Sequence, residues 1–266
     1  MPQNKLLKLQ NLLQGMESVL VAFSGGIDSS LVLKIAHDSL ASGAIAVTAV
    51  SPTFPEIELK TARRVGEEIG VRHLIIETDQ LAIPDFVRND AGRCYHCKTD
   101  LYQALQKLQL ELNMGAMVDG TNLDDLGDDR PGIVAAREWG VRSPLVEAEL
   151  SKAEVRTLAK ELGLSNWDKP AAACLSSRIP RGSVITREKL TQVEQAESLL
   201  VQEGFRQFRV RQHGEIARIE IEEEELSRWI DPERRIRVST QLKALGFRFV
   251  TLDLEGYRRG GGNPKA

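Results

Sequence analysis

Short apolar runs alternate with amphipathic stretches over the first two-thirds of the chain. The runs lack a polar face, which is typical of strands buried on both sides of a sheet, and they cover residues 19–23, 44–50, 74–76, 116–118 and 143–146. The stretches between them predict helices at residues 29–41, 56–70, 98–112, 131–138 and 152–162. Strands separated by helices form right-handed crossovers, so the pattern predicts an α/β fold with a doubly wound parallel sheet. Ser151 and Glu154 have the spacing of a capping box at the start of the last of these helices.

A different pattern begins after about residue 166. A loop leads to a predicted helix at 187–203, and strand-like runs at 205–210 and 215–222 flank a turn at residues 212–214. Residues 223–245 look mostly helical, and we expect an apolar run at 247–254 to join the two strands. The sequence therefore predicts a smaller C-terminal α+β domain. The expected parts of the chain are a doubly wound domain over 1–166, a connecting loop over 167–186 and the α+β domain over 187–266.

Composition narrows the class of protein. The 266 residues include 35 Lys+Arg and 38 Asp+Glu, a net charge of −3, and a chain of this length can bury a core without disulfides. No run approaches the ~18 apolar residues that span a bilayer, so we expect no membrane association. The near-neutral charge argues against a general nucleic-acid binder. Three cysteines without a secretory leader predict a reducing, cytoplasmic location.

The strongest motif is Ser-Gly-Gly-Ile-Asp-Ser-Ser at residues 24–30, between the first predicted strand and the first long helix. Glycines permit close backbone approach, and the loop and helix N-terminus direct N–H groups at one point, which favours a phosphate. The serines add hydroxyl donors. The motif lacks the lysine of a Walker loop and the spacing of GxGxxG, so it supports neither of those nucleotide folds.

This loop resembles the signature of the PP-loop ATP pyrophosphatases, which have the adenine nucleotide α-hydrolase-like fold. The resemblance implies cleavage of ATP between its α and β phosphates, adenylation of a substrate carboxylate and release of pyrophosphate. It implies that Mg²⁺ and the loop hold the pyrophosphate, that Ser51 lies near the adenosine, and that the segment after a later strand closes the site. The nucleotide-binding residues would be Ser24, Gly25, Gly26, Asp28, Ser29, Ser30, Ser51, Gly120, Thr121 and Asn122, with Asp28 counted as catalytic.

Four aspartates follow that last segment, at positions 124, 125, 128 and 129. An acidic surface loop would explain them. A contact between one of them and Mg²⁺ or the substrate would explain them as well.

All three cysteines lie at chemically suggestive positions. Cys94 and Cys97 form a CxxC directly before a predicted helix, where N–H groups favour a thiolate, and Cys174 follows in a distant loop. A structural zinc lacks a fourth ligand, and a redox pair leaves Cys174 without a role. Three thiolates instead suit a [4Fe–4S] cluster with one open iron, and separate packing roles are the remaining alternative.

Over essentially its whole length the chain resembles the LarE family of ATP-dependent sulfur transferases. The resemblance rests on the glycine loop, on Gly120-Thr-Asn-x-Asp-Asp125 and on Cys174-Leu-Ser-Ser-Arg-Ile-Pro180. It implies adenylation of pyridinium-3,5-biscarboxylic acid mononucleotide and conversion of its carboxylates to thiocarboxylates, in biosynthesis of the nickel-pincer nucleotide of lactate racemase. In the single-cysteine form of the family, the residue matching Cys174 gives up its own sulfur and becomes dehydroalanine. The additional Cys94 and Cys97 favour the cluster-bearing type here.

The implied mononucleotide carries a phosphate and carboxylates, anions that suit arginine. Arg178 lies close to Cys174, and Arg209 and Arg211 are two apart on a predicted strand and therefore share a face, where they predict a phosphate clamp. Arg258 could complete it, and Glu197 on the preceding helix is a weaker candidate. Surface salt bridges are the alternative for each arginine. The family also implies a homo-oligomer.

Three other functions share part of this pattern. A tRNA thiolase also combines a PP-loop with three cysteines, but residues 187–266 contain nearly equal numbers of acidic and basic side chains, so nucleic acid is not the expected partner. An amide-forming synthetase of the NAD synthase type would leave the cysteines without a purpose. A nucleotide-binding module without enzymatic activity is the last alternative.

Overall fold

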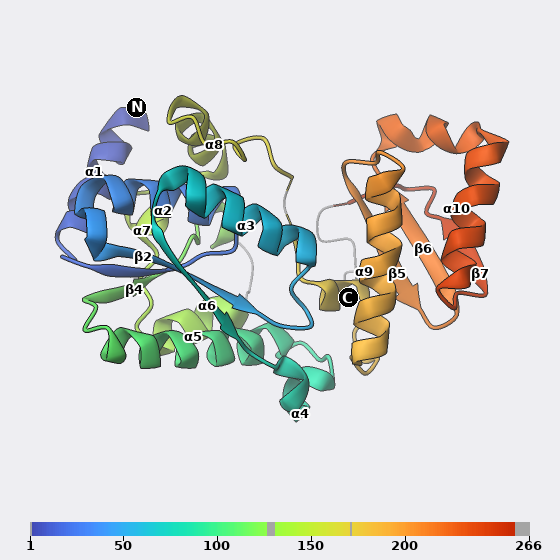
Figure 1. Ribbon diagram of the computed structural model, residues 1–266, viewed down its shortest axis with the longest axis horizontal. Coiled ribbons are helices and arrows are strands. Elements are labelled where there is room, and N and C mark those ends of the chain that lie inside the picture. The colour runs from blue at the N-terminus through green and yellow to red at the C-terminus, as the bar shows by residue number, and fades with distance from the viewer. Residues whose placement is uncertain (1, 127–130, 171, 259–266) are drawn as a thin grey trace. The chain divides into compact units, whose positions relative to one another are not determined.

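The computed structural model describes residues 2–126, 131–170 and 172–258 (Figure 1). Contacts within it divide the chain into two compact units, of which the first comprises Met1–Gln80 and Gly92–Ala172. The second unit comprises Leu81–Ala91 and Ala173–Ala266. The chain therefore passes from the first unit to the second for the last time after Ala172, within the connecting loop expected at 167–186. The assignment of the short segment before Gly92 to the second unit has no counterpart in the sequence pattern.

The first unit is built on a parallel sheet with strand order β3-β2-β1-β4. Val19 of β1 is paired with Ala44 of β2 on one side and with Ala116 of β4 on the other. These strands are rich in Val, Ile and Ala and are largely buried, as strands covered on both faces must be. The four strands are β1 Val19–Ala22, β2 Ala44–Val50, β3 Arg72–Glu77 and β4 Ala116–Val118.

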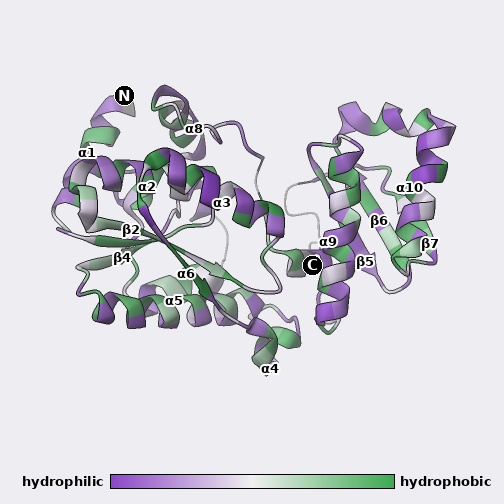
Figure 2. Cartoon of the chain, in the orientation of Figure 1, coloured by the Kyte–Doolittle hydropathy of each residue, from purple (hydrophilic) through white to green (hydrophobic). Residues whose placement is uncertain are grey.

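Helices cover both faces of this sheet (Figure 1). Val19 and Val21 of β1 point into a core with α1, α2, α3 and α8, whereas Leu20 between them points into a second core with α5 and α6. The helices carry bands of hydrophobic and hydrophilic residues that match this burial (Figure 2). The predicted α/β fold with a doubly wound parallel sheet is confirmed. The helices are α1 Pro2–Gln14, α2 Ile27–Leu40, α3 Glu56–Ile69, α5 Arg93–Glu111, α6 Pro131–Glu138 and α8 Lys152–Glu161.

The predicted strand at residues 143–146 is wrong. This segment forms the short helix α7 Pro144–Glu147, and only Arg142 before it makes a parallel bridge, with Val118. Pro144 occupies the first turn, where its fixed φ suits a helix and its missing N–H costs nothing, whereas a central strand would need that donor.

The second unit contains a three-stranded sheet with order β5-β6-β7. The strands β5 Phe208–His213 and β6 Ile216–Ile221 form an antiparallel hairpin whose turn contains Gly214 at φ +63°, and β7 Phe249–Leu252 joins β6 in parallel. Helices α9 Arg187–Gln202 and α10 Pro232–Ala244 share a buried core with this sheet. The expected α+β arrangement is confirmed.

Short helical segments occur in both units, namely η1 Ala41–Gly43, η2 Gln80–Ala82, α4 Pro84–Val87, η3 Leu123–Asp125, η4 Leu175–Arg178 and η5 Glu223–Ile230.

Asn89 ties the segment of residues 81–91 into the second unit. Its side chain is fully buried, its φ is +58°, and its Nδ2 donates to the carbonyl oxygens of Ile179, Pro180 and Ser183 at 3.3, 2.8 and 3.0 Å. Its own carbonyl oxygen accepts a hydrogen bond from the backbone N–H of Gly182. An asparagine tolerates this left-handed backbone better than most residues, and its amide satisfies carbonyls that would otherwise be buried without donors.

No helix in the described parts of the chain is both long enough and apolar enough to cross a bilayer.

Replacing Asn89 with Ala should destabilise the second unit, because the buried carbonyl oxygens lose their donors. We expect a loss of about 2–3 kcal/mol in the free energy of unfolding, measured by urea denaturation. Asn113→Ala is the matched control, since the backbone of Asn113 is also in the left-handed region, at φ +52°, but its side chain is exposed. Equal effects of the two substitutions would show that backbone conformation alone explains the role of Asn89.

Candidate active site

The glycine loop leaves β1 and enters α2 in a conformation that requires glycine. Gly25 has φ +69°, and a Cβ at this position would lie 2.8 Å from the backbone of Ala62 on α3. Gly26 caps α2 without a side-chain hydrogen bond to the helix. The loop therefore packs closely against α3 and leaves the positive end of α2 suited to an anion.

The serine hydroxyls of the motif bond to the loop itself. Ser29 and Ser30 donate to the carbonyl oxygen of Gly26 at 3.0 and 2.9 Å, and Ser24 Oγ lies 3.3 Å from Ser29 Oγ. Ser30 is fully buried and also accepts a hydrogen bond from Asn166 Nδ2 at 2.8 Å. Ser24 is exposed. In this structure the hydroxyls hold the shape of the loop, and Asn166 supports it from a distant position.

Asp28 lies in the first turn of α2 and has partners on both carboxylate oxygens. Lys152 Nζ contacts Oδ2, and Asn122 Nδ2 donates to Oδ1 at 3.2 Å. Lys152 is the first residue of α8, whose predicted capping box of Ser151 and Glu154 is confirmed. The α2 loop, the segment after β4 and the start of α8 therefore meet at Asp28.

The segment after β4 packs directly on the glycine loop. A Cβ on Gly120 would lie 2.6 Å from the backbone nitrogen of Ser29. Thr121 donates from its backbone N–H and its hydroxyl to the buried carboxylate of Asp119, at 3.0 and 2.8 Å. That carboxylate also accepts hydrogen bonds from Tyr102 and Ser143. Asp119 therefore fixes the backbone that closes against the loop.

The two described aspartates after this segment have structural partners. Asn122 and Asp125 form a capping box on η3, and Asp124 Oδ2 accepts a hydrogen bond from the backbone nitrogen of Lys152 at 3.0 Å. Asp128 and Asp129 lie outside the described residues. Asp124 therefore helps to hold the start of α8.

Ser51 follows β2, next to the glycine loop in strand order. Its Oγ lies 3.0 Å from Thr53 Oγ1. The residues after β2, β1 and β4 are at the carboxyl ends of adjacent parallel strands, and the direction of winding reverses between β1 and β4. Open α/β sheets bind their ligands at such a reversal.

All three cysteines of the chain are thiols without disulfides. Cys94 and Cys97 lie inside α5, which begins at Arg93, so the prediction that they precede a helix is wrong. Gly92 caps the helix, and the residues from Arg93 onward contain no glycine or proline that would delay its start. The two thiols are three residues apart and share a helix face, whereas Cys174 belongs to the second unit. Across the described ranges, no three or more His, Cys, Asp and Glu side chains are grouped as a metal site.

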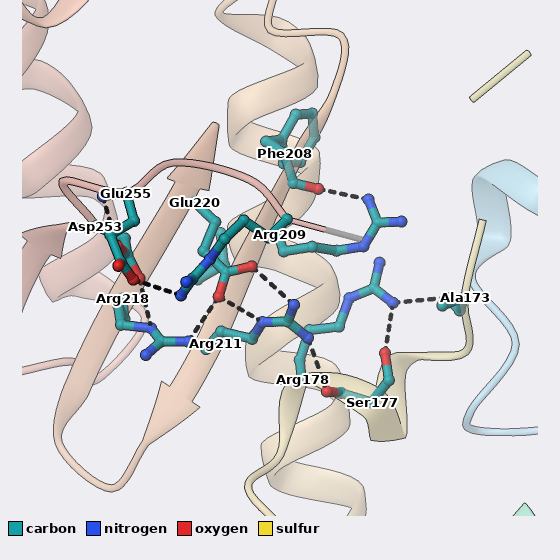
Figure 3. A network of polar contacts seen from close by, with 12 residues as sticks. Ala173, Ser177, Arg178, Phe208, Arg209, Arg211, Arg218, Glu220, Asp253 and Glu255 are labelled. Atoms are coloured by element: carbon teal, nitrogen blue, oxygen red, sulfur yellow. Dashed lines mark hydrogen bonds and ion pairs between the residues drawn. The ribbon is translucent and has the colours of Figure 1, made fainter. Parts of the chain in front are cut away.

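Arg178 organises the backbone on both sides of Cys174, and Figure 3 shows its contacts with Ala173 and Ser177. It is 3% exposed, its Nε and Nη2 each donate to Glu197 at 2.8 Å, and its Nη1 donates to the carbonyl oxygens of Ala173 and Cys174 at 2.7 and 3.0 Å. Burial alone would lower the pKa of Arg178, but the carboxylate of Glu197 outweighs it and raises that pKa. Glu197 also accepts a hydrogen bond from the backbone nitrogen of Val210, so it holds both η4 and β5.

Arg211 and Arg209 lie side by side on β5 but differ in their partners (Figure 3). Arg211 is buried, donates twice to Glu220 at 3.0 and 2.7 Å, and donates to the carbonyl oxygen of Ser177 at 2.9 Å. Arg209 donates to the carbonyl oxygen of Phe208 and lies over the ring of Tyr257, 5.1 Å from its centroid. Burial, and then the charge of Arg178, lower the pKa of Arg209.

The fourth predicted arginine has a different environment. Arg258 is exposed and pairs with Glu255 at 2.6 Å. Three of the proposed substrate arginines are therefore buried or partly buried in one network of the second unit.

A family model matches the first part of the chain and agrees with a PP-loop, adenine nucleotide α-hydrolase-like type of the α/β fold, and individual relatives match nearly all of the chain. The family model of asparagine synthase matches residues 9–105. An uncharacterized protein of Synechocystis is 44% identical over 260 residues, which cover 98% of this chain and 97% of that protein. The pyridinium-3,5-bisthiocarboxylic acid mononucleotide synthase (LarE) of Lactiplantibacillus plantarum is 41% identical over 257 residues, 93% of this chain and 90% of the synthase. The chain belongs to the LarE family. An uncharacterized protein of Methanocaldococcus jannaschii is 32% identical over 96% of this chain and 97% of its own length.

Sequence reasoning missed three residues that shape the site of this LarE-family protein, namely Asp119, Lys152 and Asn166. Asp119 stands directly before the Gly-Thr-Asn segment and Lys152 directly after a predicted helix cap, so both adjoin motifs that the sequence does display. Asn166 lies at the end of the first predicted domain, where no local pattern marks it.

Gly120→Ala should weaken nucleotide binding strongly without unfolding the protein. The added methyl would lie 2.6 Å from the backbone of Ser29 and would push the glycine loop away from β4. Isothermal calorimetry with ATP measures the loss, which we expect to exceed about tenfold in Kd. Gly140→Ala is the control for a glycine with open space around it, although its φ of +66° carries its own backbone cost. Retention of ATP affinity by Gly120→Ala would contradict this account of the loop.

Proposed function

We propose that this protein is an ATP-dependent sulfur transferase that converts pyridinium-3,5-biscarboxylic acid mononucleotide into its bisthiocarboxylic acid, in nickel-pincer nucleotide biosynthesis. The observation that carries the proposal is the 41% identity to the synthase over nearly the whole of both chains. The glycine loop of the first unit and the arginine network beside Cys174 in the second unit supply groups that such a reaction needs.

The first unit would perform the adenylation. A substrate carboxylate oxygen attacks the α phosphorus of ATP, the bond to the β phosphate breaks, and pyrophosphate leaves. The start of α2, where the cap Gly26 offers no side-chain hydrogen bond, and the backbone of the glycine loop suit the departing pyrophosphate. Asp28 offers a carboxylate of the kind that binds Mg²⁺.

Sulfur would then displace AMP from the acyl adenylate. Cys94 and Cys97, one helical turn apart, fit two ligands of an iron–sulfur cluster, and Cys174 would have to provide the third. A bound [4Fe–4S] cluster would supply a sulfide nucleophile on its open iron. We favour this source because the chain has three cysteines where a sacrificial mechanism needs one.

The sacrificial alternative uses Cys174 itself. Its Sγ attacks the acyl carbon and AMP leaves, after which loss of the Cα proton breaks the Cβ–Sγ bond. The products are the thiocarboxylate and dehydroalanine. Arg178 holds the carbonyl groups on both sides of Cys174, which would fix the direction of the thiol in either mechanism.

The phosphate of the mononucleotide would bind at the arginines of the second unit. Arg178 and Arg211 are buried, whereas Arg209 is partly exposed beside the ring of Tyr257. Of the three, Arg209 is therefore the one that a phosphate arriving from solvent can reach most readily.

The reaction and its sulfur source can be tested together. Wild-type protein purified without oxygen should contain iron and acid-labile sulfide, and the Cys97→Ala variant should contain neither. With ATP and the pyridinium substrate, the wild type should release pyrophosphate and form thiocarboxylates, which mass spectrometry would detect. Absence of iron together with loss of the mass of H₂S from Cys174 after turnover would establish the sacrificial mechanism instead. Thiolation of bulk tRNA but not of the pyridinium mononucleotide would overturn the proposed substrate.

Arg209→Gln should raise the KM for the mononucleotide about 10- to 100-fold, because the substrate phosphate loses a charge-assisted hydrogen bond. The KM for ATP should stay unchanged, because the substitution does not alter the first unit. Steady-state pyrophosphate release measures both constants. Arg237→Gln is the control, since it removes an exposed ion pair with Glu203 at 2.7 Å in the same unit. An unchanged KM for the mononucleotide in Arg209→Gln would contradict the proposal that Arg209 binds the phosphate.

A further inference from the structure

The peptide that leads into the glycine loop is held by a side chain of the neighbouring strand. Phe23 lies between β1 and Ser24, and its backbone N–H donates to the carbonyl oxygen of Val47 on β2 at 2.8 Å. The carbonyl oxygen of Phe23 accepts a hydrogen bond from the hydroxyl of the fully buried Thr48 at 2.7 Å. At the other end of the same peptide, the N–H of Ser24 donates to Ser29 Oγ at 3.3 Å. Thr48 therefore helps to set the direction in which the loop leaves the sheet.

The hydroxyl of Thr48 has a second partner on β3. His73 Nε2 lies 2.8 Å from Thr48 Oγ1. A hydroxyl has one hydrogen, and that of Thr48 is directed at the carbonyl oxygen of Phe23, so Oγ1 accepts its second hydrogen bond from His73. His73 therefore carries a hydrogen on Nε2, and a chain of two hydrogen bonds runs from β3 to the start of the glycine loop.

The surroundings of the imidazole ring favour its neutral form. Burial, and then the charge of Arg63, lower the pKa of His73, and the charge of Glu67 offsets part of this shift. A histidine whose pKa lies below its ordinary value is mostly neutral at pH 7 and carries one ring hydrogen. The ring contacts that of Phe23 edge to face, with 5.4 Å between centroids, and a Cβ on Gly66 of α3 would lie 3.0 Å from Nδ1. Packing therefore fixes the ring with Nε2 toward Thr48.

We propose that His73 is a positioning residue of the nucleotide site: it donates from Nε2 to Thr48, and through that hydroxyl it holds the carbonyl group of Phe23 and orients the glycine loop for ATP. This inference rests on the use of ATP in the proposed function. His73 acts from the edge strand β3, through one residue of β2, on the strand that carries the loop. The affinity for ATP should therefore depend on a hydrogen-bond donor at position 73 and a hydroxyl at position 48.

The test measures ATP binding by calorimetry in the full-length protein. Thr48→Val and His73→Leu remove the hydrogen bonds, and each should weaken ATP binding about 5- to 30-fold. Thr48→Ser and His73→Gln keep a hydroxyl and a donor, so both should stay within about threefold of the wild-type affinity. Thr157→Val is the matched control, since the hydroxyl of Thr157 donates to the carbonyl oxygen of Ala153 at 3.1 Å on the exposed surface of α8. This control should bind ATP as the wild type does.

Two further measurements separate the hydrogen-bond chain from a general effect on stability. The double variant Thr48→Val, His73→Leu should bind ATP at most about threefold more weakly than Thr48→Val alone, because both substitutions break the same chain. Long-range ¹H–¹⁵N correlation spectra of the imidazole rings should show a hydrogen on Nε2 of His73 and none on Nδ1. The signals of His73 are identified by their absence from the spectrum of His73→Gln.

Wild-type ATP affinity in Thr48→Val would overturn the assignment. So would an equal loss of affinity in Thr48→Ser and His73→Gln, which would indicate packing in place of hydrogen bonding, and so would a hydrogen on Nδ1 of His73 in place of Nε2. A wild type that binds no ATP would contradict the proposed function as well. A wild type that binds ATP with the expected dependence on His73 but makes no thiocarboxylate would contradict only the sulfur transfer.

Discussion

The loop after β1 lies between two backbones that leave no room for a Cβ atom. Gly25 faces Ala62 of α3, and Gly120 faces Ser29 of the loop itself. These close approaches fix the start of α2 relative to β4, and the side chains of Asp28 and Asn122 can meet only because of that arrangement. The parallel strands deliver the other segments of the candidate site to the same edge of the sheet.

The second unit differs from the first because it contains buried ion pairs. Arg178 and Arg211 are almost fully buried, and each donates two hydrogen bonds to one carboxylate. Arg218 shares the carboxylate of Glu220 with Arg211 (Figure 3). Removing charges from water costs roughly what such pairs return, so these pairs contribute little net stability. Their effect is geometric: they hold η4 against β5 and so orient the backbone around Cys174.

The features that could be predicted from the sequence are those with a local pattern. Apolar runs identified four of the five proposed strands of the first unit, and the glycine motif located the start of α2. The failures arose where local preference was ambiguous: a short apolar run such as residues 143–146 is equally compatible with a short helix, and the start of α5 carries no side-chain cap that would mark it. Asp119 and Lys152 could not be assigned, because their partners are brought together only by the sheet order and the packing of α8 on α2.

The segment around Asn89 has a consequence for synthesis of the chain. The polypeptide changes unit after Gln80, again after Ala91 and finally after Ala172. Asn89 is therefore synthesised long before Ile179, Pro180 and Ser183, whose carbonyl oxygens accept its hydrogen bonds. Until then the hydrogen bonds from Asn89 to those carbonyl groups cannot form, and no contiguous C-terminal fragment that starts after Ala172 contains the whole second unit.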